Sequence, residues 1–262
     1  MKTIRLLFGI SCLSLVLFAT SCNKDSGKSR LTVYLTDAPA EYDAVNIDIA
    51  ALEIKTTNDT GDDGWQTLSL VSPGVNNLLE FTNGMDALLA SIELPAGKVS
   101  QLRLILGDDN TVVVNGVSQP LPLETPSAQT SGLKFNIHAD LVEGVEYKIW
   151  IDFDAARSIV VTGNNSYILK PVIRTFTEAT SGAIKGVVLP AASDPWVSAI
   201  MGTDTLSAAP DPVTGQYLIR GVPPGIWKIL ADGSNGYIDQ TINNINVTLG
   251  QLTVVDTITL VQ

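Results

Sequence analysis

The stretch AVNIDIAALEI, residues 44–54, decides the fold class of this chain. Its first apolar side chains fall on alternate positions, Val45, Ile47 and Ile49. A period of two is typical of a strand with one buried face, whereas a helix repeats about every 3.6 residues. The apolar positions then shift phase to Leu52 and Ile54. Because such a shift moves side chains to the opposite face of a sheet, we expect a β-bulge at Ala50 and Ala51.

Alternating apolar segments recur along the whole chain and are separated by turn-forming Gly, Pro, Asn and Asp residues. They predict strands at 31–36, 65–70, 98–107, 111–115, 132–137, 145–153 and 167–176. Two short segments have helical character instead, 85–91 and 154–160, the second with Asp154 as its N-cap. We therefore expect an all-β chain whose first part contains one or two short helices.

A small polar linker, TEATSG (177–182), divides the chain. The segment after it consists of short strands broken by Gly, Pro and Asn, at a spacing typical of a small β-sandwich. We expect two β-sandwich domains in tandem. The predicted segments are a signal peptide (1–21), a polar tether (22–30), a first sandwich (31–176), the linker (177–182) and a second sandwich (183–262).

The N-terminus has the regions of an export signal. Lys2 and Arg5 flank the start of an apolar run that ends at Ala19, shorter than the ~20 residues of a comfortable bilayer crossing. Small residues precede Cys22 and a polar tether follows it, so LFATSCNKDSGKSR (17–30) resembles a bacterial lipobox. The resemblance implies that a lipid on Cys22 attaches the protein to a membrane. An ordinary cleavage site with an incidental cysteine is the alternative.

The residues directly after Cys22 indicate where the anchor lies. Asn23-Lys24-Asp25 resembles the surface-export signal of Bacteroidetes-type lipoproteins, which combines Lys with acidic residues. No later segment is long and apolar enough to span a bilayer. The expected location is therefore the outer membrane, and the sequence leaves both display on the cell surface and a periplasmic orientation open.

Charge and cysteine content exclude several classes of function. Without Lys2 and Arg5 the 16 basic residues become 14 against 27 acidic residues, a net charge of −13. Such a charge argues against nucleic acid as a partner, because that binding depends on Lys and Arg neutralising phosphates. With Cys22 lipidated and Cys12 removed, no thiol is left for a disulfide or a thiolate metal site.

The second sandwich carries three characteristic segments: GAIKGVV (182–188), GQYLIRGVPPGIWKI (215–229) and INVTLGQLTVVDTITL (245–260). Together they resemble the carboxypeptidase-regulatory-like, or transthyretin-like, family. Pro223-Pro224-Gly225 is expected to form a rigid turn, and Trp227 stands where the family usually has Tyr packed on the sandwich. The resemblance implies a non-catalytic module. The wider fold group includes starch-binding domains, an analogy at the level of the fold.

The first sandwich resembles the lipoprotein domain of unknown function numbered 4382, common in Bacteroidetes-type bacteria. The segments that carry the resemblance are 31–54, 94–107, 132–137 and 151–174, which include the TDAP, FDAARSIV and LKPVIR motifs. It implies an exported location and a β-sandwich fold, and no activity.

Strand alternation over 148–154 suggests a ligand-binding face. It places Trp150, Asp152 and Asp154 on the same side, an aromatic ring beside carboxylates as in sugar-binding patches. Trp65 and Trp196 are further aromatic candidates. The alternative is structural: Asp154 caps the short helix, Arg157 pairs locally and Trp150 packs under a loop.

Acidic and hydroxyl side chains suggest three further features. NDTGDDG (58–64) offers Asp59, Asp62 and Asp63 as oxygen ligands for a calcium ion, the one cofactor considered, although an acidic hairpin turn explains the same residues. Thr205 and Thr257 lie in Asp-Thr-hydrophobe triplets that resemble the O-glycosylation motif of Bacteroidetes-type exported proteins. Asp37 is expected to make an Asx-type turn before Pro39.

Catalysis has little support in the sequence. His138 is the only histidine, and it has no Gly-x-Ser-x-Gly elbow or remaining cysteine to work with. We therefore expect a non-enzymatic, lipid-anchored envelope protein with a binding or adhesive role, and carbohydrate as its ligand. The alternatives are an accessory subunit that recognises an envelope protein, and a glycosidase that uses Asp152 or Asp154.

Overall fold

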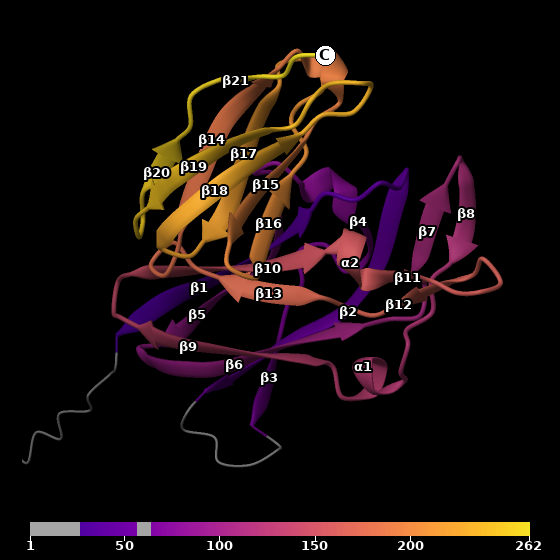
Figure 1. Ribbon diagram of the computed structural model, residues 1–262. Coiled ribbons are helices and arrows are strands. Elements are labelled where there is room, and N and C mark those ends of the chain that lie inside the picture. Colours follow the sequence, from indigo (N-terminus) through magenta and orange to yellow (C-terminus); the bar gives the residue numbers. More distant parts are fainter. Residues whose placement is uncertain (1–26, 57–63) are drawn as a thin grey trace, which may run out of the picture.

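The computed structural model describes residues 27–56 and 64–262, and it is built almost entirely of strands (Figure 1). Two separate hydrophobic cores organise it. The core of the N-terminal unit is formed by side chains between Leu31 and Leu169, and that of the C-terminal unit by side chains between Ile184 and Leu260. Both units are sandwiches of β-sheets, so the expected all-β fold is confirmed. In the described part of the chain, no helix is long and apolar enough to cross a bilayer.

The N-terminal unit is built on two large sheets. The first has the strand order β13-β10-β1-β5, with β1 (Lys28–Ala38), β5 (Ala87–Pro95), β10 (Glu146–Asp154) and β13 (Ile173–Phe176). The second has the order β8-β7-β2-β6-β9, with β2 (Ala44–Thr56), β6 (Gly97–Leu106), β7 (Thr111–Val114), β8 (Val117–Pro120) and β9 (Leu133–Leu141). Strands β3 (Trp65–Leu68) and β4 (Gly74–Asn77) also pair with β2.

Short elements complete the N-terminal unit. They are η1 (Leu78–Phe81), α1 (Ser127–Thr130), α2 (Ala155–Ser158) and the two-stranded sheet of β11 (Ile159–Val161) with β12 (Tyr167–Leu169). Asp154 caps α2, as predicted, by accepting a hydrogen bond from the backbone N–H of Arg157. The segment predicted as one strand over 167–176 divides into β12 and β13 at Pro171, which has no backbone N–H to donate to a sheet.

The predicted bulge lies in β2. The pairing of β2 with β6 shifts register between Ile49 and Ala51, so the five apolar side chains of residues 44–54 all reach the core. Each of them is at most 1% exposed: Val45, Ile47, Ile49, Leu52 and Ile54. The change of phase in the sequence is thus absorbed by one extra residue in the strand.

The helix predicted at 85–91 is wrong. Residues 87–95 form β5, which runs antiparallel to β1 with Val33 opposite Ala90 and Leu31 opposite Ile92. Ala and Leu favour helices in isolation, but the edge of β1 offers backbone hydrogen bonds and buries Leu89 in the core. Tertiary pairing therefore overrides the local propensity.

Strands β1 and β10 are parallel neighbours, although more than 100 residues separate them in sequence. Their register places Thr36 opposite Asp152, Asp37 opposite Phe153 and Ala38 opposite Asp154. Because the carboxyl ends of parallel strands meet at one edge, the TDAP motif and the start of α2 lie side by side there.

The C-terminal unit is a sandwich of two sheets. One has the order β17-β14-β20 with β21 also on β14: β14 (Gly182–Leu189), β17 (Gln216–Val222), β20 (Leu252–Val254) and β21 (Ile258–Thr259). The other has the order β16-β15-β18-β19: β15 (Trp196–Met201), β16 (Asp204–Ala208), β18 (Gly225–Asp232) and β19 (Gln240–Val247). The short helix η2 (Ala191–Ser193) connects β14 to β15.

The Pro-Pro-Gly segment carries the chain from one sheet of this sandwich to the other, since it joins β17 to β18. Trp227 follows it and is 1% exposed, with its indole N–H donating to the carbonyl oxygen of Pro223 at 2.9 Å. The expected packing of Trp227 on the sandwich is confirmed.

Candidate binding site

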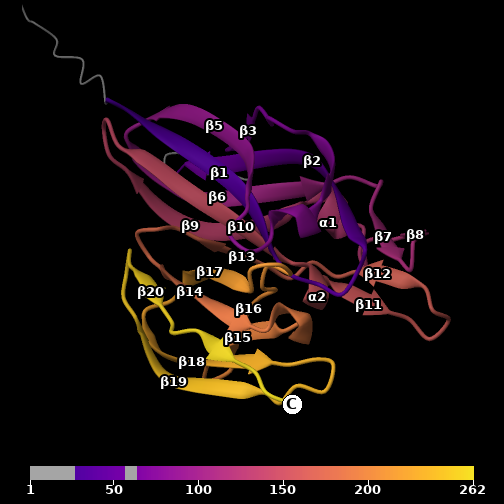
Figure 2. The same cartoon turned by 90° about the horizontal axis from the view of Figure 1, so that it is seen from above.

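The two units meet along the free edge of β17. Figure 1 shows the C-terminal unit above the sheet that contains β10 and β13, and Figure 2 shows β17 next to β13. The side-chain amide of Asn83 accepts from the N–H of Leu218 at 2.7 Å and donates to the carbonyl of Gln216 at 3.1 Å. The amide thus pairs with the edge strand as another strand would, and satisfies two backbone groups of an otherwise open edge.

Arg174 on β13 satisfies two further backbone groups of that edge. Its guanidinium donates to the carbonyl oxygen of Gly221 at 2.6 Å and to that of Arg220 at 3.1 Å. The same group binds Asp152, with Nε to Oδ2 at 2.7 Å. One arginine therefore holds β10, β13 and β17 together.

Asp86 links the units at a third point. Its Oδ2 accepts from the indole N–H of Trp150 at 3.0 Å and from Nη1 of Arg220 at 2.6 Å. The indole and Asp86 belong to the N-terminal unit, while Arg220 lies on β17. The charge pair is partly exposed, so its direct contribution is small, but it fixes where β17 lies.

Replacing Asn83 by Ala is expected to destabilise the folded protein by about 1–3 kcal/mol, because the β17 N–H and C=O that it binds lose their partners. Asn115→Ala is the matched control. Both residues occupy the left-handed region before a glycine, with φ of 53° and 50°, but Asn115 lies in the β7–β8 turn away from the C-terminal unit. Urea unfolding of both variants measures the difference, and equal losses would contradict this role of Asn83.

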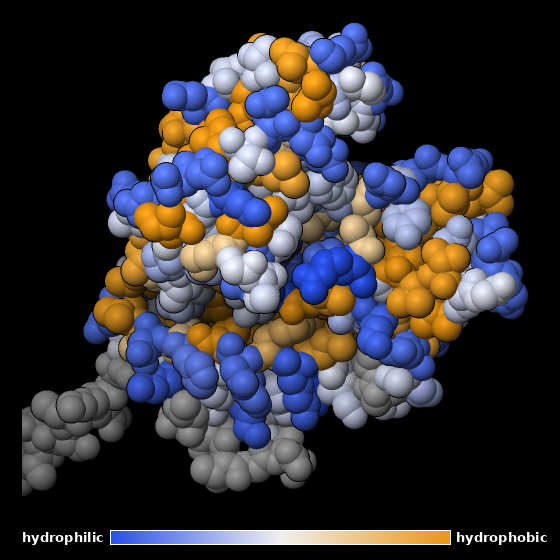
Figure 3. Space-filling view, viewed as in Figure 1, coloured by the Kyte–Doolittle hydropathy of each residue, from blue (hydrophilic) through white to orange (hydrophobic). Residues whose placement is uncertain are grey.

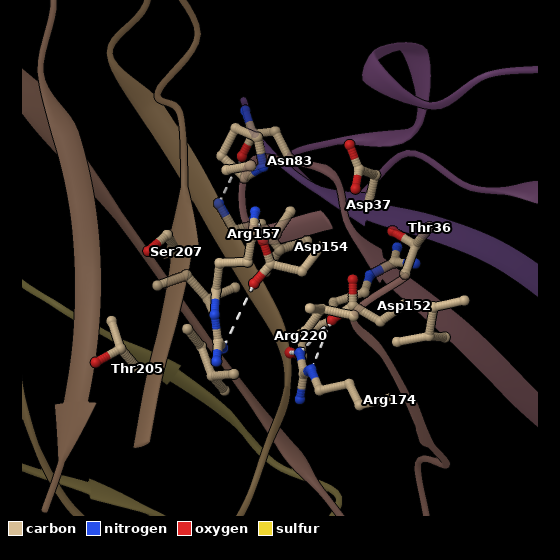
Figure 4. A pocket seen from close by; sticks show the side chains of 18 of the residues that line it. Thr36, Asp37, Asn83, Asp152, Asp154, Arg157, Arg174, Thr205, Ser207 and Arg220 are labelled. Atoms are coloured by element: carbon tan, nitrogen blue, oxygen red, sulfur yellow. Dashed lines mark hydrogen bonds and ion pairs between the residues drawn. The ribbon is translucent and has the colours of Figure 1, made fainter. Parts of the chain in front are cut away.

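A cleft of about 500 Å³ opens beside this contact. Both units line it; the residues used below are Thr36, Asp37, Asp152 and Asp154 from one side and Trp196, Thr205 and Ser207 from the other. The space-filling view shows the surface hollowed between the units, with strongly hydrophilic atoms in the hollow (Figure 3). In the close-up, Thr205 and Ser207 lie across from Thr36 and Asp37, with Asp154 and Arg157 between them (Figure 4).

Asp152 and Asp154 are both engaged by the fold. Asp152 is 7% exposed and ion-paired with Arg174. Asp154 accepts from the N–H of Arg157 at 2.9 Å, and its other oxygen lies 3.7 Å from the guanidinium of that residue. Burial raises the pKa of Asp154, while the hydrogen bond and the charge of Arg157 act in the opposite direction.

Asp37 lies deeper in the same wall. Its Oδ1 accepts from the N–H of Ala155 at 3.0 Å, so the side chain holds the start of α2 instead of making the expected local turn before Pro39. Its Oδ2 is buried without a hydrogen-bond partner. Burial, together with the charges of Asp152 and Asp154, raises the pKa of Asp37 to about 9.

Trp150 lies on the predicted face of β10 but not at the surface. That face is turned toward the C-terminal unit, and Trp150 is only 5% exposed. Its ring is stacked between Tyr34 and Phe176, with centroid separations of 5.3 and 5.5 Å. Since both ring faces are covered, Trp150 supports the contact between the units and offers no face for a sugar ring.

Trp65 is far from the other candidates. It lies on β3, on the side of the N-terminal unit away from the C-terminal unit (Figure 1). The guanidinium of Arg103 lies 4.3 Å from the ring centroid, a cation–π contact. The structure therefore does not bring Trp65 together with Trp150, Asp152 and Asp154.

The remaining sequence candidates are distributed as follows. Thr205 and Thr257 are both exposed, Thr205 on the cleft wall. Cys22 and the three calcium candidates Asp59, Asp62 and Asp63 lie outside the described residues. Within residues 27–56 and 64–262, no group of three or more His, Cys, Asp or Glu side chains is arranged to hold a metal ion.

Comparison with known proteins gives the family of the N-terminal unit. Residues 28–171 match the model of the domain of unknown function DUF4382. The chain belongs to the DUF4382 family. That match covers the TDAP motif, α2 and all the strands of the N-terminal unit except β13. No curated protein matches the chain.

Solved structures give weaker likenesses to this DUF4382 protein. They include the TIE protein of Bacillus anthracis (9% identity, TM-score 0.23, covering 90% of this chain and 34% of that one). Two others are the minor pilin GBS52 of Streptococcus agalactiae (10%, 0.22, covering 90% and 97%) and the major pilin subunit BcpA of Bacillus cereus (10%, 0.20, covering 90% and 100%). The chain thus spans about a third of the TIE protein, and TM-scores this low establish no common fold.

Sequence reasoning missed the part that Asp37 has in the cleft. The TDAP and FDAARSIV motifs both stood out in the sequence, but only the parallel pairing of β1 with β10 brings them together. The signal that could have predicted this site is the presence of two such motifs, each at the end of an apolar strand. Asn83 gave no comparable signal, because its turn resembles any Asn-Gly turn.

Proposed function

We propose that this protein is an exported, lipid-anchored, non-catalytic binding protein of the bacterial cell envelope, and that it binds a glycan in the cleft between its two units. The lipobox-like stretch ending at Cys22 supports the anchor and the location. The resemblance of the C-terminal segments to the carboxypeptidase-regulatory-like family supports a binding role. Protease treatment of intact cells, which releases surface-displayed protein, tests the location.

The single observation that carries the proposal is the composition of the cleft. It combines hydroxyls, carboxylates and one half-buried aromatic side chain, Trp196, in a concave site of about 500 Å³. Ligand sites are commonly concave, occur at domain interfaces and hold a few well-placed polar groups beside apolar surface. A sugar presents hydroxyls on its edges and C–H groups on its faces, so it matches both kinds of surface.

Binding without catalysis is favoured by the state of the carboxylates. A glycosidase needs two carboxyl groups free to act on opposite sides of the scissile bond. Asp152 is held by Arg174, and Asp154 is held as the cap of α2. Neither carboxylate can leave these partners without opening the contact between the units or the helix.

The test is binding of the protein from residue 27 onward, which contains both cores, to an array of defined glycans. We expect binding that Trp196→Ala weakens at least about tenfold, because stacking on an aromatic ring contributes on the order of 1–3 kcal/mol. Trp65→Ala is the matched control and should bind as the wild type does, since Trp65 lies on the far sheet. Absence of glycan binding, or equal loss in both variants, would contradict the proposal.

A further inference from the structure

The cleft between the units continues past Trp196 into a second hollow of about 440 Å³. Four residues line this hollow: Glu41, Tyr42, Ala156 and Trp196. Ala156 and Trp196 also line the cleft of about 500 Å³, so the two spaces adjoin at these side chains. Glu41 and Tyr42 lie in the connection from β1 to β2, just after the TDAP motif. The hollow therefore extends the cleft, and it too has one wall from each unit.

The two aromatic side chains of the hollow, Tyr42 and Trp196, are half-buried and come from different units. Across the part of the chain that the structure describes, neither ring stacks on another ring or lies under a cation. Trp150, in contrast, is stacked between two rings, and Trp65 lies against Arg103. The aromatic surface that lines the hollow is therefore open to a ligand.

Three polar groups of the hollow are open in the same way. Over residues 27–56 and 64–262, neither the hydroxyl of Tyr42 nor the indole N–H of Trp196 makes a hydrogen bond, and the carboxylate of Glu41 makes neither a hydrogen bond nor an ion pair. The indoles of Trp150 and Trp227 both donate to partners in the fold. The polar end of a Tyr or Trp side chain normally has a partner where the ring is enclosed, so a ligand in the hollow can supply it.

The charge of Glu41 distinguishes the hollow from the cleft. In the cleft, Asp152 is paired with Arg174, and Asp154 is held as the cap of α2. Glu41 is exposed, and the residues that line the hollow with it include no Lys or Arg. Its carboxylate can accept hydrogen bonds from hydroxyl groups and disfavours a second negative charge beside it.

We propose that this hollow is a second sugar subsite, in which Tyr42 and Trp196 contact the faces of one pyranose unit and Glu41 accepts hydrogen bonds from its hydroxyls. The ligand is then a linear neutral oligosaccharide that extends from the cleft across Trp196 into the hollow. The inference rests on the proposed glycan-binding function and adds the class and the length of the ligand. Equatorially substituted units, such as glucose and xylose, suit the subsite because they present C–H groups on both faces.

The first experiment compares ligand lengths on the wild-type protein by calorimetric titration. The probes are disaccharides and hexasaccharides of β-linked glucose, xylose and N-acetylglucosamine, with hexagalacturonate as the acidic probe. In at least one neutral series, we expect the hexasaccharide to bind about tenfold or more tightly than the disaccharide, because only the longer chain reaches both spaces. Equal affinities of the two lengths in every series would overturn the second subsite.

The second experiment removes the lining residues one at a time. Tyr42→Ala should weaken binding of the hexasaccharide about tenfold, whereas Tyr42→Phe keeps the ring and should stay within about threefold of the wild type. Glu41→Ala should also weaken it about tenfold, since a charged acceptor is lost. Tyr147→Ala is the matched control and should bind as the wild type does. Tyr147 is also half-buried against the N-terminal core, but it lies at the start of β10, at the opposite end of that strand from Asp154.

The outcomes separate the inference from the function on which it rests. Full hexasaccharide affinity in Tyr42→Ala and Glu41→Ala, together with a loss in Trp196→Ala, overturns the second subsite and leaves binding in the cleft intact. If Tyr42→Ala does not fold, Glu41→Ala decides, because Glu41 is exposed. Tighter binding of hexagalacturonate than of every neutral probe overturns the neutral ligand. Failure of the wild type to bind any saccharide contradicts the proposed function and the inference together.

Discussion

Asp37→Asn is expected to become progressively more stable than the wild-type protein as the pH rises from about 4 to about 9. The folded wild type keeps the proton on Asp37 up to a pKa of about 9, whereas the unfolded chain releases it near its ordinary pKa of about 4. Folding therefore takes up a proton at Asp37 between these values, and the contribution of Asp37 to wild-type stability falls with rising pH by about 1.4 kcal/mol per unit. Asn is neutral throughout and avoids this loss.

Urea unfolding of both proteins at pH 5, 7 and 9 measures the effect. The pH-dependent part of the difference should be about 1.5 kcal/mol at pH 5, on the order of several kcal/mol at pH 9, and constant above that. Asp204→Asn, at an exposed aspartate on β16, is the control for a simple change of net charge. Stability curves of the wild type and Asp37→Asn that run parallel with pH would show that Asp37 is ionised in the fold.

Trp227→Ala is expected to cost about 3–5 kcal/mol of folding free energy. Trp227 is the largest fully buried side chain of the C-terminal core, and its removal leaves a cavity that the two sheets cannot close. It also leaves the carbonyl oxygen of Pro223, at the turn between the sheets, without its indole donor. A loss of this size should unfold the C-terminal unit well before the N-terminal one.

Thermal unfolding combined with limited proteolysis distinguishes the two units. Trp196→Ala is the matched control within the same sandwich, because Trp196 is only half-buried at the cleft. It should lower the midpoint far less than Trp227→Ala does. Equal effects of the two substitutions would mean that Trp227 is not the centre of this core.

Much of the fold could be predicted from residue patterns, because sheet burial imposes a period of two. The phase shift in residues 44–54 predicted the bulge in β2, and Asp154 was correctly identified as the cap of α2. Prediction failed at 85–91, where the helix propensity of Ala and Leu gave way to pairing with β1. Such pairing joins distant segments and leaves no local mark in the sequence.

The candidate site was only partly predictable for the same reason. Alternation placed Trp150, Asp152 and Asp154 on one face correctly, but it could not show that the C-terminal unit covers this face. The C-terminal unit is held over this face partly by the hydrogen bonds between the amide of Asn83 and the edge of β17. These groups lie more than 130 positions apart in the sequence. Only the parallel register of β1 and β10 places Asp37 beside the residues of the cleft.

Binding of a saccharide in the cleft between the units can be tested most directly through the indole N–H resonances of the four tryptophans. Trp196 reports on the cleft, Trp150 on the contact beneath it, Trp227 on the C-terminal core and Trp65 on the far sheet. Titration with a neutral hexasaccharide found to bind should shift the Trp196 resonance in a saturable manner and leave Trp65 and Trp227 unchanged. A shift at Trp65 with none at Trp196 would contradict the account.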